Sequence, residues 1–430
     1  MRKYFILLLA LLLIMGCSQS EIPIEDGYWE GIVTIKDSKF FIYLTAKDNQ
    51  LFLAIPEQLI SDVPVEDLRV SDEELSFSLQ LGTATLRFVL FPQQNGFDGK
   101  VLYNTTSGTV MLREGRYTVE HRKLEAPERL GSQVSITTPR ATLYGTYLAP
   151  TGSGPFPTLL FVQGSGPTDR DGNSELIVES NDNLWHLAHE LRDAGIATVR
   201  YDKFAVGTSM PEQLDSVKDT DFDDFVSDAV QWLEYIKEQL PYTEIGILGH
   251  SEGSLVALLA SQQTPVDYVI SVAGNGDPIA NQMIKQVSRI NEEAGQILKK
   301  RLDEIKNSQY AETGNVYVDT FIPLGSEKYL QSWMAYNPSD VLRNTQVPVL
   351  VTWGSRDERF AGADDLFEQS GIPQQVIFAE IPNMGHMLRY AENDIDLKKS
   401  YSDRTMPLHP QFLETVISFI LQYSTTGGAQ

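Results

Sequence analysis

The stretch that decides the interpretation of this chain is Gly-His-Ser-Glu-Gly at residues 249–253. Residues 243–248 before it predict a short buried strand, and residues 254–260 after it predict the start of an apolar helix. A serine between two glycines on such a strand-to-helix turn has its hydroxyl held out into a site. The pattern makes Ser251 a candidate nucleophile; the alternative is a helix-capping serine in an ordinary glycine-rich turn.

Length and composition indicate a multidomain chain with an acidic surface. The chain has 430 residues, of which 42% are hydrophobic and 10% aromatic, which is enough for more than one buried core and predicts two or three domains. The formal net charge is −24. A surface of this sign repels phosphate backbones, so nucleic-acid binding is not expected.

The N-terminus has the pattern of a secretory signal peptide. Arg2 and Lys3 precede the apolar run 4–15, and a small residue, Gly16, follows. The run is too short for a membrane-spanning helix, so residues 1–16 are interpreted as a cleaved targeting segment.

The residues Leu-Ile-Met-Gly-Cys at 13–17 resemble the bacterial lipobox. This resemblance implies cleavage before Cys17 and attachment of lipid to it, which would anchor the protein to a membrane. Cys17 is the single cysteine of the chain, so no intrachain disulfide can form. Ser18 follows it, and under the Gram-negative sorting rule this implies the periplasmic side of the outer membrane. The alternative is a plain secreted protein with a cleavage site nearby.

Residues 17–26 are expected to form a tether, and residues 27–116 an antiparallel β-domain. Short apolar or alternating runs recur about every ten residues, separated by turn residues, which favours a sandwich or a small barrel. The runs lie at 29–35, 40–44, 51–55, 74–79 and 85–91. No acid/base or metal-binding constellation is found among them. A structural spacer is favoured over a surface that binds a substrate or partner. Residues 117–131 are interpreted as a linker.

From residue 132 to 424 the pattern changes to strands that alternate with helices. A hairpin is expected at 134–137 and 143–148, followed by further strands at 158–162, 196–201, 243–248, 268–272, 347–353 and 375–378. Helices are expected at 184–194, at 222–240, after residue 253 and at 411–423. Such alternation predicts an α/β fold with a mostly parallel sheet covered on both faces.

The interval 277–344 interrupts this alternation. It contains no convincing sheet strand, and residues 281–306 and 329–336 have helical character. We interpret the interval as a helical cap inserted between two core strands. A mobile cap over the site and a packed excursion without a gating role remain alternatives.

A serine nucleophile needs a general base, and His386 is the best placed of the six histidines. It follows the last sheet strand, at the edge where open α/β sheets bind ligands. The carboxylate that orients such a histidine is expected to be Asp357, after the preceding strand. The other carboxylates considered for this role are Glu358, Asp364 and Asp365.

The order Ser251, Asp357, His386 is that of the α/β-hydrolase superfamily, and two further loops resemble it. Residues 163–173 resemble the loop H-G-S-G-P-x-D-R-D-G-N, and residues 200–209 resemble R-Y-D-K-R-G-x-G-x-S. More narrowly, the chain resembles bacterial exported esterases that carry an N-terminal β-domain. It departs from this pattern at Gln163, where histidine is usual, and at Phe204-Ala205, where Arg-Gly is usual.

The resemblance implies a serine esterase that acts on small acyl esters through an acyl-enzyme and needs no cofactor. It implies an oxyanion hole formed by the backbone N–H of Glu252 and one from the first loop, with Ser165 preferred over Gly166. A peptidase or thioesterase with the same triad is an alternative reaction. A non-catalytic envelope protein that keeps the fold for binding is an alternative of another class.

The acidic loop Asp-Arg-Asp-Gly-Asn at 169–173 is not interpreted as a metal site. A calcium loop has glycine at position six and glutamate at position twelve, whereas here glycine is fourth and Ser180 is twelfth. A charge network that braces the neighbouring loop is expected instead.

Substitution of Cys17 tests the anchor. We expect the wild-type protein to fractionate with membranes and Cys17→Ser to be released into the soluble fraction, because the variant cannot accept lipid. Membrane association of Cys17→Ser equal to that of the wild type would contradict the lipobox interpretation.

Overall fold

The computed structural model describes residues 26–35, 38–55, 60–81, 84–103, 106–114, 130–174, 180–211, 219–309, 315, 318, 322, 326–357, 359, 367 and 371–424. The chain divides into two compact units with their main boundary near residue 116, and each is described by itself. The signal peptide and Cys17 lie outside the described residues, as does nearly all of the linker.

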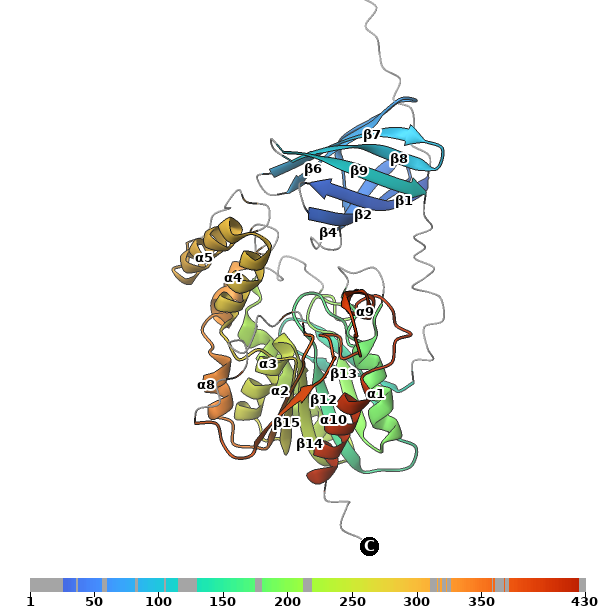
Figure 1. Cartoon of the computed structure of the whole chain (residues 1–430). Coiled ribbons are helices and arrows are strands. Elements are labelled where there is room, and N and C mark those ends of the chain that lie inside the picture. The colour runs from blue at the N-terminus through green and yellow to red at the C-terminus, as the bar shows by residue number, and fades with distance from the viewer. Residues whose placement is uncertain are drawn as a thin grey trace, which may run out of the picture. The chain divides into compact units, whose positions relative to one another are not determined.

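The N-terminal unit is a single nine-stranded sheet with the order β4-β3-β2-β1-β9-β8-β7-β6-β5. Alternate side chains such as Val33, Ile42, Leu53 and Phe88 are buried, which is the period of a sheet with one face on a core. The expectation of an all-β region is therefore confirmed, as one curled sheet rather than two packed sheets (Figure 1). The strands are β1 Gly27–Ile35, β2 Ser38–Lys47, β3 Gln50–Ile55, β4 Ile60–Pro64, β5 Glu66–Val70, β6 Leu75–Leu81, β7 Ala84–Gln93, β8 Gly96–Tyr103 and β9 Thr106–Glu114.

The second unit is built on an eight-stranded sheet with the order β10-β11-β13-β12-β14-β15-β16-β17. The hairpin β10–β11 pairs antiparallel with β13, and all the following strand pairs are parallel. The parallel strands β12 to β16 are mostly buried on both faces, which explains their apolar runs, whereas β17 at the edge is partly exposed. Their bounds are β10 Ser132–Thr137, β11 Thr142–Leu148, β12 Phe156–Val162, β13 Ala197–Tyr201, β14 Tyr242–His250, β15 Tyr268–Val272, β16 Val349–Gly354 and β17 Val376–Ile381.

Helices cover both faces of this sheet, as the alternation predicted (Figure 1). The helices α1 (Asn183–Asp193) and α10 (Pro410–Gln422) pack on one face around Leu187 and Phe412. The helices α2 (Phe222–Gln239) and α3 (Glu252–Gln263) pack on the other face around Trp232 and Val256. A further helix, α9 (Asp394–Ser400), was not expected from the sequence.

The interval between β15 and β16 is helical in its described residues and contributes no strand to the sheet. Its helices are α4 Ile279–Ile290, α5 Glu292–Lys306, α7 Glu327–Trp333 and α8 Pro338–Arg343. The expected helical stretch 281–306 is two helices, because Asn291 leaves the helical conformation and its side chain caps α5 by accepting from Ala294 N–H. The helices α4, α5 and α7 share a core that includes Val287, Leu298 and Leu330.

In the described part of the chain, no helix combines the length and the apolar character that crossing a membrane requires.

Replacing Ala205 by glycine tests the turn that follows β13. Ala205 has a φ of 61°, in the left-handed region, where a Cβ costs about 1–2 kcal/mol. We expect Ala205→Gly to raise the free energy of unfolding by about 0.5–1 kcal/mol, because relief of this strain exceeds the added flexibility of the unfolded chain. Urea denaturation followed by tryptophan fluorescence measures the change.

The matched control is Ala229→Gly within α2, where the backbone is helical. Glycine at a helix interior should lower the free energy of unfolding by about 1 kcal/mol or more. A loss of similar size for Ala205→Gly would show that the turn is not strained.

Candidate functional site

Ser251 lies on a strained turn between β14 and α3. Its φ is 56° and its ψ is −120°, a conformation that a residue with a side chain rarely adopts. Its backbone N–H donates to Val272 O at 2.9 Å. Ser251 is partly exposed, whereas the neighbouring His250 and Glu252 are each only 5% exposed. The turn thus presents the serine and buries the residues on either side.

The two glycines of the turn leave no room for a Cβ. A Cβ on Gly249 would lie 1.9 Å from Gly253 O, and one on Gly253 would lie 2.3 Å from Val162 O at the end of β12. The second glycine is therefore required because the first turn of α3 lies directly against β12. Ser251 is the N-cap residue of α3, but its side chain makes no capping hydrogen bond, so the alternative of a serine whose hydroxyl caps the helix is wrong.

Asp357 and His386 come together at the same edge of the sheet. Asp357 follows β16 and His386 follows β17, and the two residues are 6% and 5% exposed. His386 Nδ1 lies 3.0 Å from Asp357 Oδ1 and 2.8 Å from Oδ2. This pair fixes the ring so that Nδ1–H donates to the carboxylate and Nε2 is left to act as a base.

The charge state of Asp357 suits a residue that accepts the hydrogen bond from His386 Nδ1–H. Burial by itself raises the pKa of the carboxyl, but the attraction of His386, its hydrogen bond and the Arg359 N–H together hold the pKa below its usual value. The Arg359 N–H donates to Asp357 Oδ1 at 3.0 Å. Asp357 is therefore an anion at neutral pH. The other carboxylates considered, Glu358, Asp364 and Asp365, lie outside the described residues.

His250 connects the serine turn to the His386 loop, a contact that the sequence analysis missed. Its Nε2 lies 2.9 Å from His386 O, and the two ring centroids are 4.9 Å apart. Burial, together with the nearby His386, lowers the pKa of His250 to about 3. The ring is therefore neutral and donates from Nε2–H. Its position directly before Ser251 was the available signal, but sequence does not show which way a side chain points.

The loop after β12 lies against the serine turn. A Cβ placed on Gly164 would be 3.3 Å from Ser251 Cβ. Ser165 and Gly166 follow directly and are exposed, and Gly166 has a φ of 74°. Glu252 is the first residue of α3, so its N–H is one of the unpaired donors of a helix N-terminus. The structure thus brings the three candidate oxyanion-hole residues to the surroundings of Ser251.

Three other histidines have structural partners, and His121 lies outside the described residues. His186 Nε2 bonds to Arg404 O at 2.7 Å, and His189 Nδ1 bonds to Trp185 O at 2.8 Å. The His409 ring packs against that of Tyr390, with the centroids 5.7 Å apart, and hydrogen-bonds to the backbone of Pro382. These contacts leave His386 as the histidine paired with a carboxylate beside the serine turn.

The acidic loop 169–173 forms the expected charge network. Asp169 Oδ1 accepts from the N–H groups of Asp171 and Asn173 at 2.9 and 2.8 Å. Arg170 binds Asp202 through two nitrogens, at 3.0 and 2.6 Å, and Arg200 forms an ion pair with Asp171. The network joins the loop after β12 to β13. Among the described residues, no three histidine, cysteine or acidic side chains are grouped as metal ligands.

The departures from the esterase pattern are accommodated locally. The Nε2 of Gln163 donates to Tyr201 O, and its buried Oε1 has no hydrogen-bond partner among the described residues. Phe204 lies beneath the guanidinium of Arg140, which is 4.4 Å from the ring centroid. Ala205 adopts the positive φ that glycine adopts more easily.

The comparisons with known proteins agree with this architecture. A family model described as "Serine aminopeptidase, S33" matches residues 177–341, less than half of the chain, and includes Ser251. Esterase EstD of Thermotoga maritima is 24% identical over 270 residues, which are 61% of this chain and 63% of that protein. The match therefore spans less than two thirds of that relative.

Two solved structures match part of this chain at low identity. Est1E of Butyrivibrio proteoclasticus with bound ferulic acid is 18% identical, covering 67% of this chain and 98% of that one, with a TM-score of 0.43. A proline iminopeptidase of Mycobacterium smegmatis is 15% identical, covering 69% of this chain and 100% of that one, with a TM-score of 0.43.

The sheet order and the serine turn after β14 define the second unit as an α/β-hydrolase fold. The family match and the esterase relative support the same assignment.

Asp169 provides a test of the charge network. Burial and the nearby Asp171 raise its pKa to about 7 from 3.8. A carboxyl with a raised pKa contributes stability below pH 4 that is lost as the pH rises through 7. An asparagine side chain at this position can accept the same N–H groups without a charge. We therefore expect the free energy of unfolding of Asp169→Asn, relative to that of the wild type, to increase by about 1–3 kcal/mol as the pH is raised from 4 to 8.

Urea denaturation at pH 4, 6 and 8 measures this difference. The control is Asp193→Asn, whose carboxylate is 66% exposed and whose effect should not grow with pH. An Asp169→Asn effect that is constant with pH would contradict the raised pKa.

Proposed function

We propose that this chain is a serine hydrolase that cleaves carboxylic esters. Ser251 is the nucleophile, His386 the general base and Asp357 the residue that orients the base. The observation that carries the proposal is the buried His386–Asp357 hydrogen bond, 2.8 Å long, beside the strained turn that presents Ser251. An oriented histidine base and a serine held on such a turn are the groups that acyl transfer requires, which supports the proposal.

The proposed reaction proceeds through an acyl-enzyme. His386 Nε2 takes the proton of Ser251 Oγ as the oxygen attacks the acyl carbonyl, and then gives that proton to the departing alcohol. Water attacks the acyl-enzyme with the same base and releases the acid. The negative oxygen of each tetrahedral intermediate is held by the N–H groups of Glu252 and Ser165, with Gly166 as the alternative to Ser165. One such donor is worth about 3 kcal/mol.

An ester is the substrate class that we propose, and an amide is the second candidate. The name of the Thermotoga maritima relative, an esterase, supports the first. The description of the matching family, a serine aminopeptidase, favours the second. A panel of nitrophenyl esters and aminoacyl nitroanilides distinguishes them by kcat/KM. We expect the ester rates to be higher, since alkoxides leave more easily than amines.

We also propose that the protein works in the cell envelope on a lipid attached to Cys17. The lipobox resemblance at 13–17 supports this location. Residues 17–26 would then form the tether between the lipid and the folded part of the chain. The proposed partners are the membrane and a small acyl ester.

A fluorophosphonate probe tests the proposed nucleophile. We expect the wild-type protein to be labelled and Ser251→Ala to remain unlabelled, because the probe reacts with activated serine hydroxyls. Ser261→Ala, at the other end of α3, is the control and should be labelled like the wild type. An unlabelled wild type, or equal labelling of Ser251→Ala, would overturn the proposal.

The rate of nitrophenyl ester hydrolysis tests whether Asp357 is the carboxylate that orients His386. Asp357→Asn should slow turnover by about 10⁴-fold, since the amide favours the wrong tautomer of His386. An unchanged rate would move the role to another carboxylate.

A further inference from the structure

Lys203 is a buried lysine that reaches the loop beside Ser251. It follows β13, is 3% exposed, and its Nζ donates to Gly164 O at 2.6 Å. The Gly164 carbonyl and the Ser165 N–H belong to one planar peptide group and point in opposite directions. Lys203 therefore fixes the direction of the Ser165 N–H by holding the other side of the same peptide.

Glu252 is the second buried partner of Lys203. Its side chain is buried beneath the serine turn, with Oε1 4.0 Å from Lys203 Nζ. The backbone N–H of Glu252 is the other candidate oxyanion donor. Lys203 therefore interacts with both candidate donors. It binds the peptide that carries the Ser165 N–H, and its counter-ion is the side chain of Glu252, whose backbone carries the second N–H.

Tyr329 brings the cap into the same cluster. It lies on α7, and its hydroxyl donates to Glu252 Oε2. Its ring meets Phe225 edge to face at 5.9 Å, and Lys203 Nζ lies 5.3 Å from the centroid of Phe225. A helix of the cap is therefore linked by one hydrogen bond to the residue that follows Ser251.

The electrostatics of this cluster are costly for the fold. Burial lowers the pKa of Lys203, and Glu252 opposes that shift. Burial raises the pKa of Glu252, and Lys203 and Tyr329 oppose that shift. A buried pair of charges is seldom more stable than apolar residues of the same size, so its place at the serine turn points to a task in the site.

We propose that Lys203, Glu252 and Tyr329 form a positioning unit that aligns the N–H groups of Ser165 and Glu252 on the oxyanion and couples that alignment to the seating of α7. This inference rests on the proposed serine-hydrolase function. None of the three side chains needs to contact the substrate. The unit acts in the transition state, where the oxyanion forms, and so affects kcat more than KM. It also selects Ser165 over Gly166, because the Gly164–Ser165 peptide is the one that Lys203 holds.

Two variants test the unit. Lys203→Met removes the donor to Gly164 O at similar length, and Tyr329→Phe removes only the hydroxyl that binds Glu252. We expect kcat for a nitrophenyl ester to fall on the order of 10–100-fold for Lys203→Met and about 3–10-fold for Tyr329→Phe, with KM changed less than about threefold. The affinity of a trifluoromethyl ketone, which forms a tetrahedral adduct, should weaken in proportion to kcat/KM.

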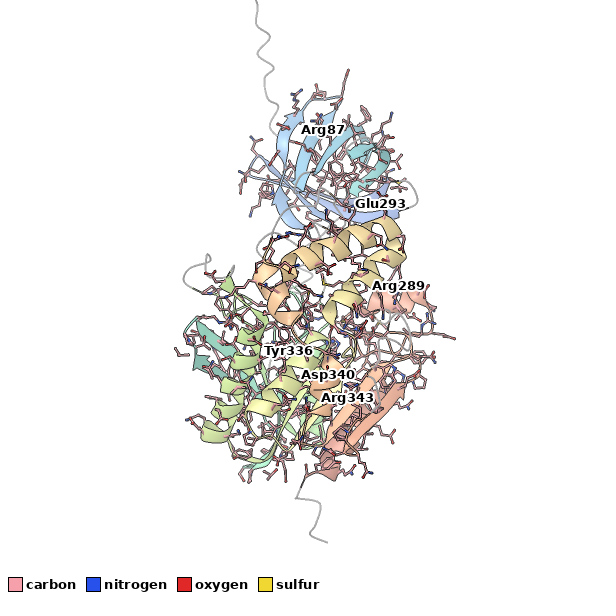
Figure 2. The ribbon with its side chains drawn as sticks, turned by 90° about the vertical axis from the view of Figure 1, so that its left-hand side faces the viewer. Arg87, Arg289, Glu293, Tyr336, Asp340 and Arg343 are labelled. Atoms are coloured by element: carbon pink, nitrogen blue, oxygen red, sulfur yellow. The ribbon has the colours of Figure 1, made fainter. Side chains whose placement is uncertain are left out.

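Tyr336→Phe is the matched control. Tyr336 lies between α7 and α8 and is labelled in Figure 2. Its ring packs 5.8 Å from that of Phe222, and its hydroxyl donates to Asp223 at 2.5 Å rather than to Glu252. The substitution removes a hydroxyl from the same aromatic cluster and should leave kcat and ketone affinity within about twofold.

The outcomes separate the positioning unit from the proposed function. If wild type neither hydrolyses esters nor reacts with the fluorophosphonate, the serine-hydrolase proposal fails. If wild type is active but Tyr329→Phe and a folded Lys203→Met match it in kcat and ketone affinity, the positioning unit alone fails. If Lys203→Met does not fold, Tyr329→Phe decides. A change confined to KM, or to the thermal midpoint, would also overturn the positioning role.

Discussion

The turn at Ser251 depends on one steric constraint: α3 begins so close to β12 that residue 253 can carry no side chain. A Cβ on Gly253 would lie 2.3 Å from Val162 O. Two residues earlier, the backbone of Ser251 takes a φ of 56° at the turn between strand and helix. The other residues of the candidate site come from the same edge of the sheet. Gly164, Asp357 and His386 all follow strands whose carboxyl ends lie there.

Two of the buried charge clusters of the second unit lie at this turn. Asp357 accepts a hydrogen bond from His386, and Glu252 is balanced by Lys203 and by the hydroxyl of Tyr329. Each arrangement orients a group that a tetrahedral intermediate would need, either a base nitrogen or a backbone N–H. Orientation in a water-poor surrounding is the main source of electrostatic stabilisation in acyl transfer. The cost in folding energy is the expected consequence of such preorganisation.

The alternation of strands and helices in the second unit could be predicted from the sequence, because buried parallel strands are apolar without interruption. The polar helix α9 was missed, as were strands such as β5, whose residues alternate weakly. The serine turn and the residues expected around it could be identified because each follows a strand. The contact between Tyr329 and Glu252 could not, since 77 residues separate them and no periodicity shows which side chains meet.

The departure from the esterase pattern at Ala205 shows that the backbone conformation of this turn is kept even where the usual glycine is absent. Ala205 stands where glycine is usual and still adopts a φ of 61°, so the turn after β13 keeps its shape at the expense of strain. That turn is held from outside: Asp202 accepts from Thr208 N–H and binds Arg170, and the next residue, Lys203, reaches Gly164 O. A network that fixes both ends of the turn can tolerate alanine within it. The same network fixes the loop of Ser165, so the strain at Ala205 and the position of the candidate oxyanion donor have a common structural cause.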